Sequence, residues 1–138
     1  MTLFSRDRRK KERSYPVAAV VFTVRSGKDP KRVSSPVTGS LRDYSPSGMS
    51  VVTPRLAPDG LHIMYDTLMT YRNHIDATIL PEGKPPIRVQ GIVIWFRGAD
   101  DPPGSYIFGL QFDKDAPAIE ELRLPERDPS DPRNPADR

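Results

Sequence analysis

The sequence predicts an all-β protein, a small six-stranded antiparallel (split) β-barrel with a short C-terminal helix. Six stretches alternate apolar and polar residues or are rich in β-branched residues, as half-buried strands are. The links between them are short and rich in Gly, Pro and Asp. A content of 16 prolines also argues against a helical chain. With 138 residues and no cysteine, the chain suits one domain in a reducing, cytoplasmic setting.

The strands are expected where alternation is clearest. In the second of them, Gly39 is the expected bulge, since glycine inside a strand often marks one. In the fifth, Val89, Gly91, Val93 and Trp95 would share one face. Trp95 is expected in the core, or in the barrel wall beneath a bound ligand, rather than as a stacking platform of its own. The six expected strands cover residues 17–24, 33–43, 49–53, 73–80, 87–96 and 105–113.

The remaining segments have weaker or different patterns. Residues 61–72 fit a strand or a helical turn, and both remain open. Asp115 could cap a short helix carrying Ile119 and Leu122, with Pro125 ending it. Residues 125–138 contain Pro, Asp and Arg with nothing to bury, so a disordered tail is expected. The longest apolar run, residues 17–22, is far too short to span a bilayer, and no hydrophobic signal segment follows the basic start, so neither a membrane span nor export is expected.

The N-terminal residues hold most of the positive charge. Residues 1–13 carry six basic and two acidic side chains, whereas the rest of the chain is close to neutral. Residues 1–14 are therefore expected to form a flexible basic arm. Within it, Arg9 and Arg13 are four residues apart and share a side in either extended or helical chain, and Arg8 stands beside the pair. Arginine hydrogen-bonds the O6/N7 edge of guanine, stacks on purines and pairs with phosphate.

The complementary chemistry lies in the turn from Asp43 to Gly48, between the second and third expected strands. Asp43 and Ser45 are two residues apart, so they point the same way in extended chain. Gly48 can take a positive φ and has no Cβ to keep a ligand from the backbone. Alone, these residues suit an ordinary surface turn. Together with the arginines they suit a clamp for an anionic ligand that contains guanine. A carboxylate can accept hydrogen bonds from the N1–H and N2–H₂ edge of guanine.

The pair Arg9-x-x-x-Arg13, followed by Asp43-x-Ser45-x-x-Gly48 in a β-rich chain, resembles the motifs of PilZ domains, bacterial receptors for cyclic di-GMP. The resemblance covers roughly residues 8–122. It implies a barrel over residues 15–124, an arm that folds over the ligand, and a helix packed on the barrel. It also implies a receptor that switches conformation and signals to an unidentified downstream effector protein. The implied ligand-binding residues are Arg8, Arg9, Arg13, Asp43, Ser45 and Gly48.

Other site classes find little support. His62 and His74 are the only histidines, and no metal, cofactor or catalytic constellation is expected around them. Tyr15 and Tyr44, beside the two motifs, are candidates to flank a purine. Two alternative functions stay open: a PilZ-like adaptor that binds protein but no nucleotide, and a small β-barrel that binds nucleic acid through its arm. The near-neutral body makes nucleic acid the weaker of these two. The sequence does not choose between one and two ligand molecules per chain.

Overall fold

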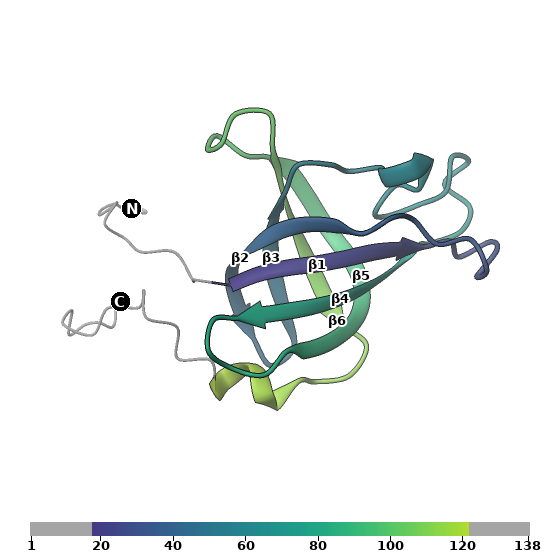
Figure 1. Ribbon diagram of the computed structural model, residues 1–138. Helices are drawn as coiled ribbons and strands as arrows, with labels where there is room; N and C mark the ends of the chain where they lie inside the picture. Colours follow the sequence, from purple (N-terminus) through teal and green to yellow (C-terminus); the bar gives the residue numbers. More distant parts are fainter. Residues whose placement is uncertain (1–17, 122–138) are drawn as a thin grey trace.

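The computed structural model describes residues 18–121, and six antiparallel strands form a closed barrel in that part of the chain (Figure 1). The order around the barrel is β1-β2-β3-β6-β5-β4, and β1 closes the ring by pairing with β4. The predicted all-β barrel with six strands is confirmed. The strands are β1 (Ala18–Arg25), β2 (Val37–Ser45), β3 (Gly48–Thr53), β4 (His74–Pro81), β5 (Ile87–Gly98) and β6 (Tyr106–Phe112).

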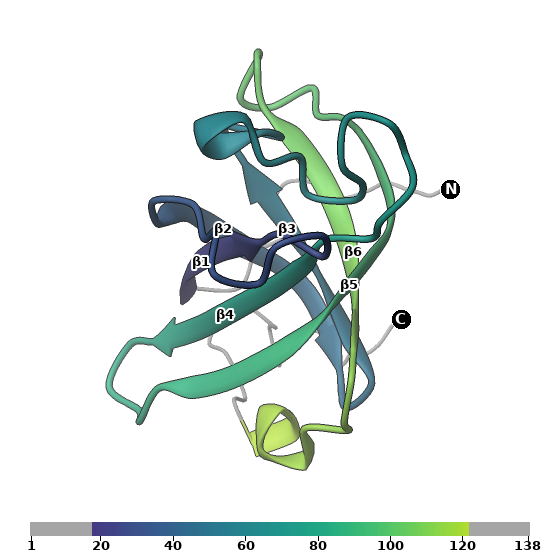
Figure 2. The same cartoon turned by 90° about the vertical axis from the view of Figure 1, so that its right-hand side faces the viewer.

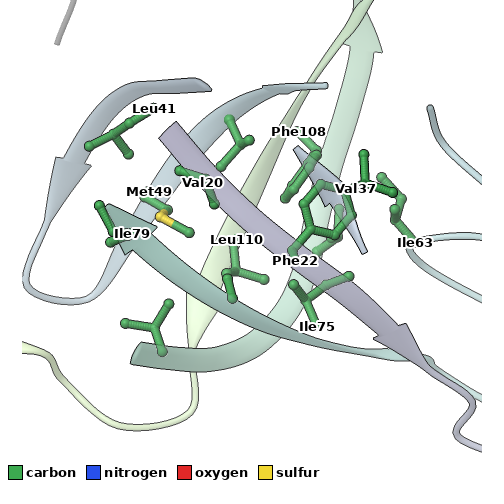
Figure 3. Close-up of a cluster of buried hydrophobic side chains, with 14 of the residues drawn as sticks. Val20, Phe22, Val37, Leu41, Met49, Ile63, Ile75, Ile79, Phe108 and Leu110 are labelled. Atoms are coloured by element: carbon green, nitrogen blue, oxygen red, sulfur yellow. The ribbon is translucent and has the colours of Figure 1, made fainter. Parts of the chain in front are cut away.

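The barrel forms because alternate side chains on each strand are apolar and point inward. In β1 every second residue from Ala18 is buried, and β4 shows the same pattern from Ile75. The rings of Phe22 and Phe108 meet edge to face, with centroids 5.3 Å apart, in the middle of the core (Figure 3). Further along the barrel, Leu41, Met49 and Ile79 gather at one end of this cluster. The closed interior is therefore a packed core rather than a ligand cavity.

The segment between β3 and β4, which the sequence left open, is a looped cover for one end of the barrel. It contains a short 3-10 helix, η1 (Pro58–Gly60), and an isolated antiparallel bridge between Tyr65 and Arg72. Ile63 is fully buried against the core. His62 accepts a hydrogen bond at Nδ1 from the Met64 amide, 3.1 Å away. Burial lowers the pKa of His62, which favours the neutral imidazole that this bond requires.

The bulge predicted at Gly39 is wrong. Gly39 pairs regularly with Val20, and a Cβ there would run into the carbonyl oxygen of Val52, so glycine is needed for close strand packing. The register of β2 against β3 instead shifts between Leu41 and Asp43. A bulge depends on how two strands pair, which residue type alone does not specify.

The expected C-terminal helix is a single 3-10 helix in the described chain, η2 (Pro117–Glu121). The Ile119 amide donates to the Ala116 carbonyl three residues earlier, at 3.0 Å, which is the 3-10 pattern. Ile119 is fully buried against the core, so this segment covers the other end of the barrel. Leu122, Pro125, the proposed tail at 125–138 and the proposed arm at 1–14 lie outside the described residues. Within residues 18–121, no helix is long and apolar enough to cross a bilayer.

We predict that Gly91→Ala destabilises the barrel by about 1–3 kcal/mol, the usual range for overpacking. A Cβ at this position would collide with the backbone carbonyl of Gln111 on β6, which cannot move without breaking the ladder. Gly98→Ala is the matched control, because it is on the same strand and a Cβ there meets nothing within 4 Å. Urea denaturation measures both. Equal stability of the two variants would contradict this account of strand packing.

Candidate functional site

The turn between β2 and β3 is organised by Ser45. The Ser45 hydroxyl accepts a hydrogen bond from the Ser47 amide and lies 3.3 Å from both the nitrogen and the hydroxyl of Ser47. The turn backbone is also held from outside. The carbonyls of Pro46 and Ser47 accept bonds from the amides of Ala116 and Phe112, at 2.7 and 2.9 Å. The turn is thus tied to both β6 and the segment that leads into η2 (Figure 1).

Asp43 lies on the outer face of the barrel, just after the β2 bulge. Its Oδ1 accepts a 2.8 Å hydrogen bond from the hydroxyl of Ser50, which is buried. The nearest cation in the described chain is Arg42, with Nη1 3.9 Å from Oδ2, and the Asp43 side chain is 60% exposed. Ser50 therefore fixes one carboxylate oxygen and leaves the other directed outward. The expectation that Asp43 and Ser45 share a side agrees with their regular pairing opposite Ser50 and Gly48.

Gly48 serves a different purpose from the one expected. In residues 18–121, the glycines with positive φ are Gly60, Gly83 and Gly104, so Gly48 does not need a left-handed conformation. A Cβ on Gly48 would lie 2.5 Å from the Leu110 carbonyl oxygen. The glycine therefore lets β3 approach β6 closely, and it leaves the outer side of the turn without a side chain.

Trp95 is the site residue that the sequence misplaced. The prediction put it on the same face as Val89, Gly91 and Val93, but the register of β5 shifts between Val93 and Trp95. The shift turns Trp95 outward, where its ring lies over Gly109 and is 39% exposed. The three large apolar residues at 94–96 already break the alternation, and this was the available signal.

The strand pairings place these groups in one row across the outer face. Asp43 is opposite Ser50, Ser50 is opposite Gly109, and Gly109 is opposite Trp95. Neighbouring strands are ~4.8 Å apart, so the row spans about 15 Å between its outer backbones. The guanidinium of Arg97, two residues further along β5, lies 6.0 Å from the centroid of the Trp95 ring. An exposed carboxylate, the buried hydroxyl that holds it and an indole ring over Gly109 therefore follow one another on this face of the sheet.

The other predicted aromatic and basic residues do not join this row in the described chain. Tyr44 lies between Asp43 and Ser45, faces the opposite way and packs against the core, so the expectation that it flanks a purine on this surface is not supported. Tyr15 and the predicted arginines Arg8, Arg9 and Arg13 lie outside the described residues. Among the described residues, no three His, Asp or Glu side chains gather where they could hold a metal ion.

Comparison with known proteins identifies one family. The family model for the PilZ domain matches residues 7–124 of the chain, which includes the arginine segment, the turn and all six strands. No curated protein and no solved structure matches the chain significantly.

We predict that Gly109→Ala displaces the Trp95 ring. A methyl group at this position would overlap the ring near Nε1 and Cε2, and a side chain on the outer face can swing away more easily than the backbone can. Trp95 is the only tryptophan, so its emission reports the change directly. The emission should shift to longer wavelength as the ring enters water, while circular dichroism retains the β-sheet spectrum. An unchanged emission spectrum would show that the ring does not rest on Gly109.

Proposed function

The chain belongs to the PilZ domain family, and from this premise we propose that it is a receptor for cyclic di-GMP without catalytic activity. The observation that carries the proposal is the outer row, which combines a positioned carboxylate with an exposed aromatic ring beside an open turn. Cyclic di-GMP offers matching groups: two guanine bases, each with a donor edge and a flat face, and two phosphates. The ligand needs no cofactor, and a cytoplasmic setting suits such a second messenger.

Each side chain of the row has a proposed role. The outward oxygen of Asp43 accepts from the N1–H and N2–H₂ edge of one guanine. Trp95 stacks on a base. Replacing such a stacking aromatic residue by alanine typically costs about 1–3 kcal/mol of binding free energy. Ser45 keeps the turn in shape and offers its hydroxyl to the polar edge of the ligand. The bare outer side at Gly48 allows the ligand to lie against the backbone.

The proposed arm can reach this face because of where β1 begins. The register pairs Ala19 with Ser40, so Ala18 lies at the level of Leu41, two residues from Asp43. Five residue steps separate Arg13 from Ala18 and span up to about 17 Å, and adjacent strands are only ~4.8 Å apart. We propose that Arg9 and Arg13 bind guanine and phosphate from the arm.

Two further parts of the proposal concern the arm. We propose that Arg8 contacts a second ligand molecule when two bind together. Binding would fix residues 1–14 against the barrel and so change the surface offered to a downstream effector protein. Residues 125–138 have no part in the proposed site.

We predict that Arg9→Ala, Arg13→Ala and Asp43→Ala each weaken cyclic di-GMP binding about ten- to a hundredfold, because each removes a charge-assisted or bidentate contact. Isothermal titration calorimetry measures the affinity and the number of ligands per chain. Lys11→Ala in the arm and Asp100→Ala on the β5–β6 loop are matched controls that should bind like the wild type.

The same titration separates the alternatives. GTP and a short single-stranded RNA are titrated separately as control ligands, each at two salt concentrations. Normal affinity in all three site variants would contradict the site. No heat with cyclic di-GMP would favour an adaptor that binds only protein, and steeply salt-dependent RNA binding would favour a nucleic-acid protein.

A further inference from the structure

The loop between η1 and β4 presents two of the most exposed large apolar side chains in the described part of the protein. Leu68 is 77% exposed and Met69 is 70% exposed, and Tyr71 beside them is also exposed. Figure 1 shows this loop projecting from the end of the barrel together with the loop that follows β1, and in Figure 2 the same end faces the viewer. We call residues 66–71 the apolar tip.

The apolar tip is held in one conformation by its own hydrogen bonds. Oδ1 of Asp66 accepts from the amides of Thr70 and Tyr71, at 2.7 and 3.0 Å. The Asp66 amide donates to the Tyr71 carbonyl, and the Met69 amide donates to the Asp66 carbonyl. Met69 has a φ of 58°, a left-handed conformation that glycine or asparagine would adopt more easily. The chain therefore keeps a large apolar side chain at a position where its backbone does not favour one.

The base of the tip is anchored to the barrel. Arg72 donates from Nη2 to the Val93 carbonyl at 2.9 Å, and its guanidinium lies 5.2 Å from the centroid of the Tyr65 ring. The Gly27 amide donates to Oδ1 of Asn73, at 2.9 Å, which ties the loop after β1 to the same base. The two loops thus form one supported surface.

The charges beside the apolar tip are mainly positive. The loop after β1 carries Lys28, Lys31 and Arg32 against Asp29, whose Oδ1 accepts from the Lys31 amide. Together with Arg72 and Asp66, the two loops carry four basic and two acidic side chains. Such a surface attracts an anionic partner.

We propose that the apolar tip is a docking site for an anionic lipid bilayer surface. The tip is convex, so its side chains can enter the soft boundary between headgroups and acyl chains while the flanking lysines remain among the headgroups. A second copy of this chain is a weaker occupant, because a symmetric contact would bring two convex tips and their cations together. The tip lies at the end of the barrel opposite the β2–β3 turn (Figure 1).

The test is co-sedimentation of the full chain with vesicles of equimolar phosphatidylglycerol and phosphatidylcholine, compared with vesicles of phosphatidylcholine alone. Leu68→Ser combined with Met69→Gly should lower the partition coefficient at least about tenfold, because the variant lacks the two apolar side chains that would be buried in the bilayer. Both side chains are exposed and glycine suits the backbone at position 69, so the variant is expected to fold. Lys28→Gln combined with Lys31→Gln should lower it about tenfold or more on the anionic vesicles only.

Leu80→Ser is the matched control, because Leu80 is also an exposed apolar residue, at 41%, but lies near the far end of β4. It should bind vesicles like the wild type. The basic N-terminal residues are present in every variant, so binding that survives the Leu68/Met69 change in full would overturn the proposal, as would no binding to anionic vesicles. A wild-type dimer that this change converts to monomer would assign the tip to self-association instead and would also overturn it.

Discussion

The candidate site depends on two β-bulges that interrupt the inward–outward alternation of the barrel. Leu41 and Val93 both point into the core, and strict alternation would send the residues two positions later, Asp43 and Trp95, the same way. The register shifts in β2 and β5 turn these side chains outward instead. Both therefore face solvent on one surface, across the β3–β6 pair that separates them. Without the bulges, a carboxylate and a tryptophan would have to be accommodated in an apolar core.

The strands between the two bulges carry small residues at that surface. Ser50 has a small side chain and Gly109 has none, so the Trp95 ring can lie directly over Gly109. Ser50 also orients the carboxylate, while Gly109 supports the indole ring. Small residues at these positions thus have two effects, since they allow close packing within the sheet and they let the indole ring lie against it.

The barrel could be predicted from the sequence because alternation is a local property, repeated in six segments. The turn from Asp43 to Gly48 could be located because its residue types serve turns. The bulges could not, because each depends on how its strand meets a partner distant in sequence. The sequence therefore predicts a bulge at Gly39 and one shared face for Val93 and Trp95, and both predictions are wrong. The cover over one end of the barrel was also unpredictable, since Ile63 is buried by contacts with several strands rather than by a local pattern. The role of Arg9 and Arg13 still rests on sequence and family.

The central claim is that cyclic di-GMP lies on the outer row between Asp43 and Trp95, and the emission of Trp95 tests it most directly. Trp95 is the only tryptophan in the chain, so a base stacked on its ring has an unambiguous signal. Titration with cyclic di-GMP should produce a saturable change in emission whose midpoint matches the calorimetric affinity, while GTP at the same concentrations should not reproduce it. Calorimetric binding with no change in Trp95 emission would contradict the account, because the ligand would then occupy another face of the barrel.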